Sequence, residues 1–180
     1  MLDTVSPMSR GVVLWPDDAT SSSIETLWVE LEEAGIATLS TEGHGRHRPH
    51  VSLMVGEGLD PQAAQDALVR VPQHPIPLQA DSVAIFPGGT IVLNVVMSRA
   101  LIDEHHRVVA LVGDLLAEPW SFYRPDHWTP HLTIAHNLTP TELAIALPII
   151  EVSLPIAGVL DSGGIEDGST GERWVRLPAG

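Results

Sequence analysis

The stretch PHVSLMV, residues 49–55, places a histidine and a serine inside a run that otherwise reads as a buried strand. Side chains alternate along a strand, so His50 and Ser52 share one face while the apolar residues between and beyond them face the other way. Taken alone, the stretch indicates only a core histidine whose ring nitrogens are satisfied by neighbours. A short His-x-Ser pattern has little specificity of its own.

A second stretch, PHLTIAH at residues 130–136, repeats the pattern and changes its meaning. His131 and Thr133 share one face of this predicted strand, again with apolar residues on the other face. A third pair of the same type occurs at residues 127–129, but a proline follows it directly and it has no apolar strand behind it. The two matched motifs therefore predict a site built from two histidines and two hydroxyls.

The two motifs occupy matching positions in an internal duplication. The order strand, helix, His-strand, Pro-started helix, strand occurs twice along the chain. Three short matches recur at nearly one offset, namely VVL at 12–14 with IVL at 91–93, Pro49-His50 with Pro130-His131, and residues 59–61 with 138–140. We expect a single domain of two pseudo-symmetric lobes, about residues 11–89 and 90–180, with strand exchange between the lobes.

Local signals predict the individual elements. Ser22 and Glu25 have the spacing of a capping box, which predicts a helix over 21–35. The remaining expectations are a helix from Asp60-Pro61 to about Arg70, a hairpin at Pro87-Gly88-Gly89, a helix over 99–116, a helix opened by Thr139-Pro140, and an exposed loop over 161–171.

Composition narrows the classes of function. A length of 180 residues with 44% hydrophobic residues indicates a globular domain, and no apolar run is long enough to cross a membrane. The N-terminal stretch has no signal-like apolar core, so we expect a cytoplasmic protein. The absence of cysteine excludes disulfides and thiolate chemistry. A formal net charge of −14 disfavours long nucleic acid, whose binding depends on many cationic contacts.

The paired motifs suit phosphoester chemistry without a metal. Near neutral pH one imidazole can be neutral and accept a proton while the other is protonated and donates one. The two hydroxyls can donate hydrogen bonds to the non-bridging phosphate oxygens and stabilise their charge.

On these residues the sequence resembles the two-histidine phosphoesterases, which include 2′-5′ RNA ligase-like proteins and cyclic phosphodiesterases. The resemblance rests on His50-Val51-Ser52-Leu53 and His131-Leu132-Thr133-Ile134 and covers nearly the whole chain. It implies an α+β, bilobal, duplicated fold, with two antiparallel sheets flanking a central cleft and helices on the outside. It also implies that His50 and His131 are catalytic and that Ser52 and Thr133 bind phosphate.

The leading hypothesis is a metal-independent phosphodiesterase that needs no cofactor. Its substrate would be a 2′,3′-cyclic phosphate or related phosphoester of a nucleotide or short RNA end. One histidine would act as base and the other as acid; His131 as base and His50 as acid is the preferred assignment, and the near symmetry of the motifs leaves the reverse assignment open. The alternatives are 2′-5′ RNA ligation and a non-catalytic nucleotide- or phosphate-binding module. A metallohydrolase using His44, His47 and His50 is a more distant option.

Other residues are candidates for substrate contacts. Arg48 can bind a phosphate, and Trp15, Tyr123 and Trp128 can stack on a nucleobase. The adjacent histidines at 105–106 lie on a predicted charged helix and are expected to face solvent.

Overall fold

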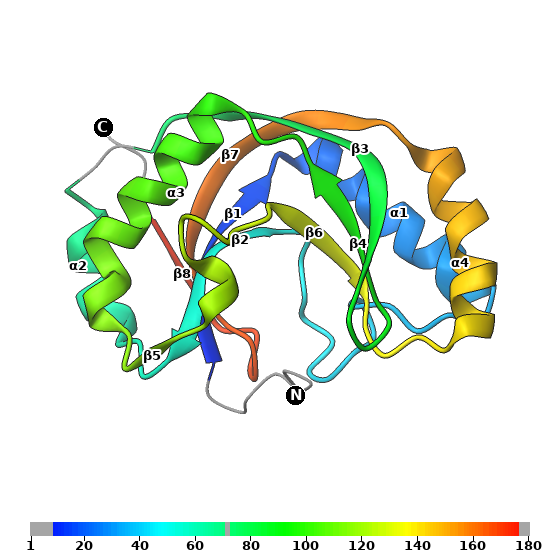
Figure 1. The fold of residues 1–180 in the computed structure, drawn as a ribbon, viewed down its shortest axis with the longest axis horizontal. Coiled ribbons are helices and arrows are strands. Elements are labelled where there is room, and N and C mark those ends of the chain that lie inside the picture. Colours follow the sequence, from blue (N-terminus) through cyan, green and yellow to red (C-terminus); the bar gives the residue numbers. More distant parts are fainter. Residues whose placement is uncertain (1–8, 71–72, 177–180) are drawn as a thin grey trace.

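The structure is a computed structural model that describes residues 9–70 and 73–176. It has an α+β fold in which a strongly curved antiparallel sheet carries its helices on the outside (Figure 1). The elements in chain order are β1 (Ser9–Pro16), α1 (Asp18–Glu33), β2 (Val51–Glu57), α2 (Pro61–Leu68), β3 (Ile76–Phe86), β4 (Thr90–Val95), α3 (Arg99–Val112), η1 (Gly113–Leu115), β5 (Glu118–Pro119), η2 (Ser121–Tyr123), β6 (His131–Ala135), α4 (Pro140–Ser153), β7 (Ile156–Asp167) and β8 (Arg173–Val175).

The same order of strands and helices occurs twice along the chain. The first half reads β1-α1-β2-α2-β3, and the second reads β4-α3-β6-α4-β7, with η1, β5 and η2 inserted before β6. The first helix of each half packs against the second helix of the other half. Helix α1 packs against α4, and α3 packs against α2 and β2. Two helix pairs therefore flank the sheet, one on each lobe (Figure 1).

The strands form one sheet where two were expected. Its order is β1-β2-β6-β4-β3-β7-β8, and β7 also pairs with β1. The first residues of β7, Ile156 to Leu160, pair with β3, and the rest of the strand pairs with β1. On the opposite side, β2 joins β6 through the pair Val51 and Leu132. These two connections close the strands into a ring.

The hydrophobic core lies between the sheet and the helices. Core side chains from the strands include Val12, Leu14, Leu53, Leu93 and Leu132, all at most 3% exposed. Alternation along the strands then leaves the opposite face for the polar residues of the two motifs. Among the described residues, no helix has the length and apolar character that crossing a membrane requires.

The helix starts are set by caps that the sequence predicted only in part. Helices α2 and α4 begin at Pro61 and Pro140 as expected, and Thr139 forms a capping box with Glu142. The predicted cap of α1 is wrong, because Asp17 caps it and Ser22 lies inside the helix. The Asp17 carboxylate accepts the backbone N–H of Thr20 at 2.9 Å and that of Val159 at 2.8 Å, which lowers its pKa. Asp17 thus joins the helix start to β7.

The hairpin at 87–89 is confirmed, since β3 and β4 pair up to Phe86 and Thr90 around it. Gly88 and Gly89 have φ of +84° and +78°, a conformation that favours glycine. The helix predicted over 99–116 ends earlier, at Val112, and continues as the 3₁₀ turn η1.

The predicted exposed loop over 161–171 is wrong, because β7 continues to Asp167. Its glycines permit close contact with neighbouring strands. A Cβ on Gly163 would lie 2.7 Å from the carbonyl oxygen of Val13, and one on Gly164 would lie 2.2 Å from that of Trp174. A glycine pair that resembles a loop signal is here a point of close packing inside a strand.

This packing predicts that Gly164→Ala lowers the free energy of unfolding by about 1–3 kcal/mol, because the added methyl group forces neighbouring backbone apart. Urea unfolding followed by circular dichroism measures the change. Gly113→Ala is the matched control, since its Cβ would meet only side-chain atoms at 3.8 Å in a helical backbone. Equal stability of the two variants would contradict the packing role.

Candidate active site

One residue pair brings the two predicted motifs together. Val51 in β2 pairs with Leu132 in β6, and both side chains are buried in the core. Because the strands are antiparallel, the residues flanking this pair lie opposite one another: His50 faces Thr133, and Ser52 faces His131. All four side chains point away from the core and are half-buried, in a locally twofold arrangement.

The two imidazoles are oriented by the same hydrogen bond. His50 Nδ1 lies 2.8 Å from the carbonyl oxygen of Arg48, and His131 Nδ1 lies 2.7 Å from that of Thr129. A carbonyl only accepts, so each Nδ1 carries a hydrogen and donates it. This bond to the residue two positions earlier leaves Nε2 of each ring for chemistry.

Burial makes His131 a weaker base in the folded protein than in a free peptide. Burial lowers the pKa of His131, the hydrogen bond to Thr129 opposes that effect, and repulsion from His50 and His136 lowers the pKa further. The neutral imidazole is therefore the favoured form of His131 near pH 7.

A stacked pair of side chains, Trp128 and His105, is connected by a hydrogen bond to the backbone of the first motif. The indole N–H of Trp128 donates to the Ser52 carbonyl at 2.9 Å, and its ring stacks on His105 with centroids 4.0 Å apart. His105 Nε2 in turn bonds the Tyr123 carbonyl at 3.0 Å. The expectation that His105 faces solvent is wrong, since it is 1% exposed; its neighbour His106 is exposed. Trp128, at 6% exposed, is a packing residue.

The three predicted substrate contacts differ in their surroundings. Tyr123 interacts with the Ser52 side chain, and burial raises its pKa to about 12, so its hydroxyl stays protonated beside the motif. Trp15 is 4% exposed and donates its N–H to Glu166 at 3.2 Å, so it offers little ring surface for stacking. Arg48 is exposed and directly precedes the first motif.

Sequence reasoning missed or undervalued several residues beside the motifs. Phe86, at the β3–β4 hairpin, meets the His131 ring edge-on with centroids 5.0 Å apart. His136 lies 3.1 Å from the Thr90 hydroxyl and interacts electrostatically with His50. Burial, together with repulsion from neighbouring histidines, lowers the pKa of His47 to about 4. No repeat match marked any of these residues as part of the site.

The two histidines in the loop before β2, His44 and His47, contact each other. The His44 and His47 rings lie 4.1 Å apart, and His44 Nδ1 accepts the Arg46 backbone N–H at 3.0 Å. Within residues 9–70 and 73–176, no three histidine or carboxylate side chains are grouped as metal ligands would be.

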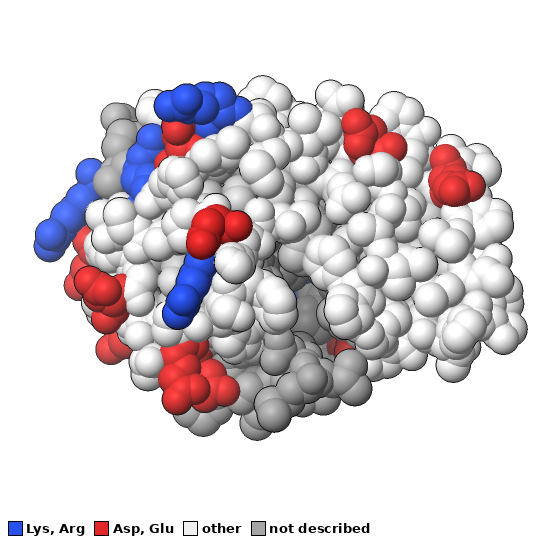
Figure 2. All heavy atoms as spheres, in the orientation of Figure 1, with Lys and Arg blue, Asp and Glu red and all other residues white. Residues whose placement is uncertain are grey.

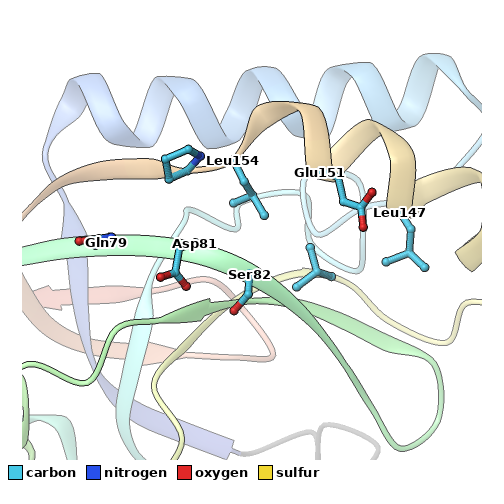
Figure 3. Close-up of a pocket in the computed structure, with 8 residues that line it drawn as sticks. Gln79, Asp81, Ser82, Leu147, Glu151 and Leu154 are labelled. Atoms are coloured by element: carbon cyan, nitrogen blue, oxygen red, sulfur yellow. The ribbon is translucent and has the colours of Figure 1, made fainter.

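A cavity of about 650 Å³ lies elsewhere, between β3 and α4 (Figure 3). Asp81 and Ser82 line it from the strand, and Leu147, Glu151 and Leu154 line it from the helix and the residue that follows. No motif residue contributes to its lining, so this cavity is separate from the candidate active site.

Comparison with known proteins identifies the family to which the chain belongs. Residues 16–162 match the 2'-5' RNA ligase superfamily, so the chain belongs to this family, and the predicted resemblance is confirmed. No curated protein sequence matches the chain. Membership supports a phosphoesterase-type enzyme.

Solved structures show the same fold at low sequence identity. A structure described as a phosphoesterase aligns with a TM-score of 0.60, 13% identity and 97% of each chain covered. Apo LigT from E. coli aligns with a TM-score of 0.60, 13% identity, 96% of this chain and 95% of that chain. Usb1 from Kluyveromyces marxianus aligns with a TM-score of 0.50, 11% identity, 95% of this chain and 98% of that chain.

The lowered histidine pKa values predict that stability falls in mild acid. Unfolded His47 takes up a proton below its ordinary pKa of 6.5, whereas the folded protein resists protonation until about pH 4. The unfolded state thus binds more protons in this window, and stability decreases as pH falls through it. His47→Gln should lose less Tm between pH 7 and pH 4.5 than the wild type, measured by circular dichroism.

Exposed His106 supplies the control for this measurement. His106→Gln should keep the wild-type dependence of Tm on pH. A His47→Gln variant with that same dependence would show that His47 is not held neutral by the fold.

Proposed function

We propose that the protein is a metal-independent phosphodiesterase that hydrolyses a 2′,3′-cyclic phosphate, or a related phosphoester, of a nucleotide or short RNA end. The observation that carries the proposal is the identical orientation of His50 and His131 on one sheet face, each beside a hydroxyl of the other motif. A core histidine needs no such matched partner across a twofold arrangement.

The geometry suggests a division of roles between the two imidazoles. Since burial lowers the pKa of His131, its neutral Nε2 is suited to take a proton from the attacking water. Water then forms the new P–O bond, and protonated His50 gives its Nε2 proton to the ribose oxygen as the ring P–O bond breaks. The product is a ribose phosphate monoester with one free hydroxyl. The proton accepted by His131 must return to His50 through solvent before the next turnover.

The hydroxyls supply the stabilisation of charge. Ser52 and Thr133 can donate to the two non-bridging phosphate oxygens, on which charge increases as water attacks. The hydroxyl of Tyr123 interacts with the Ser52 side chain and would help to hold it in place. Removing one such donor typically lowers kcat by about 10²–10³-fold.

The distribution of charge favours a small substrate. All nine cationic side chains are arginines, and five of them form ion pairs with carboxylates, namely Arg10, Arg99, Arg107, Arg173 and Arg176. On the face shown in Figure 2, the described cationic side chains gather over the lobe with α2 and α3. The lobe with α4 shows acidic groups there and no cationic ones among its described residues. A long RNA would need a continuous basic path.

Ligation of RNA ends through a 2′-5′ linkage is the second candidate, and the family match favours it. It uses the same displacement at a cyclic phosphate, with a ribose hydroxyl of the second RNA end in place of water as the attacking group and the ring P–O bond broken as before. Offering cleaved RNA halves and free cyclic nucleotide to the same preparation compares the two activities directly. We expect hydrolysis of the nucleotide to be the faster reaction.

The proposal is tested on a panel of 2′,3′-cyclic nucleotides with and without chelator. We expect turnover in both conditions, with a bell-shaped dependence on pH. His50→Ala and His131→Ala should each lower kcat by about 10²–10⁴-fold, the usual contribution of a general acid or base. The product is measured by chromatography.

His106→Ala is the control for the histidine substitutions, because this residue is exposed on α3. Full activity of the His50→Ala, His131→Ala double variant would refute the mechanism. Tight calorimetric binding of a nucleotide without turnover of any panel member would favour a non-catalytic binding module.

A further inference from the structure

A bulge in β6 brings a third histidine to the face of the candidate active site. Thr133 pairs with Val92 and Ala135 pairs with Ile91, so Ile134 is an extra residue in the strand. Ile134 and Ala135 are both fully buried in the core. The alternation therefore shifts by one residue, and half-buried His136 returns to the face of His131 and Thr133.

The first motif contains the same bulge in β2. Ser52 pairs with Val13 and Met54 pairs with Val12, so Leu53 is the extra residue. Leu53 and Met54 are both buried in the core, and half-buried Val55 returns to the site face. The duplication thus extends past the motifs, and each bulge presents the residue five positions after the catalytic histidine.

These two equivalent positions carry different side chains. Val55 is aliphatic, whereas His136 is an imidazole held 3.1 Å from the Thr90 hydroxyl. Along β6 and the residue that follows it, the site face reads His131, Thr133, His136, and Thr133 lies opposite His50. His136 therefore extends the His50 end of the site, which agrees with its electrostatic interaction with His50.

The local contacts give His136 the character of a neutral hydrogen-bonding group. A threonine hydroxyl can donate or accept, so either ring tautomer fits the contact with Thr90. Burial lowers the pKa of His136, while Glu42 raises it. Because Nδ1 makes the contact with Thr90, Nε2 is the ring nitrogen that can meet a polar group of the substrate.

We propose that His136 is a positioning residue that hydrogen-bonds a sugar hydroxyl of the nucleotide. The equivalent position of the first motif carries Val55, which cannot make this bond, so the difference between the two residues determines which end of the site holds the sugar. The inference rests on the proposed function. There His50 protonates the leaving ribose oxygen, and this oxygen remains attached to the nucleoside. The sugar must consequently occupy the His50 end, which is the end that His136 extends.

The test compares His136→Val, which copies Val55, with His136→Gln, which keeps a polar side chain. His136→Val should raise KM about tenfold with kcat little changed, as expected for loss of one hydrogen bond made equally in ground and transition states. His136→Gln should recover most of the loss, and Thr90→Val should lie between. His106→Val, at an exposed helix position, controls for the substitution itself. Unfolding midpoints verify that all variants are folded.

Calorimetry separates this inference from the proposed function. If the wild type does not turn over cyclic nucleotides, the proposed function fails, and the inference is then judged on binding alone. His136→Val should bind nucleoside 2′- and 3′-monophosphates about tenfold more weakly than the wild type, with unchanged affinity for inorganic phosphate. Equal nucleotide affinity, an equal loss toward inorganic phosphate, or no nucleotide binding by the wild type would each overturn the inference.

Discussion

The pairing of Val51 with Leu132 is the constraint on which the rest of the candidate site depends. It joins the two halves of the duplication between β2 and β6 and gives each strand one buried and one open face. Because the strands are antiparallel, the same pair places each histidine beside the hydroxyl of the other motif. A shift of one residue in either strand would send that strand's histidine toward the core, so the apolar residues of the motifs protect the register as well as the packing.

The sequence predicted the parts of the fold that repeat and the parts with strong local signals. The two motifs, the Pro-started helices and the Gly-Gly hairpin each follow from residues close together in the chain. The cap of α1 did not, because Asp17 and Ser22 are both good caps and the choice depends on Val159, which donates to Asp17 from a distant strand. The glycines of β7 likewise read as a loop because nothing local shows that another strand approaches them.

The residues of the candidate site also divide into those that local sequence patterns could predict and those that depend on distant contacts. The four motif residues could be found by periodicity and by repetition. His136 could not, since period-two alternation assigns it to the core side, and only the bulge at Ile134 returns it to the site. His105 was missed for a related reason: its helical neighbours are charged, and its burial comes from stacking on Trp128, a residue from the inserted segment. Local sequence patterns do not predict contacts between residues that are far apart in the chain.

The proposed mechanism requires two similar motifs to hold different protonation states, so their surroundings must differ. His131 meets Phe86 and is buried, which favours its neutral form. At the other end, His47 and His136 surround His50 with imidazoles that would repel a proton on it if they were themselves charged. Burial lowers the pKa of both, so near pH 7 their neutral forms are favoured and they add no positive charge to this end of the site. The backbone supplies a locally twofold site, and the different neighbours at its two ends, Phe86 beside His131 and two further histidines near His50, would let the two imidazoles take different roles in the proposed mechanism.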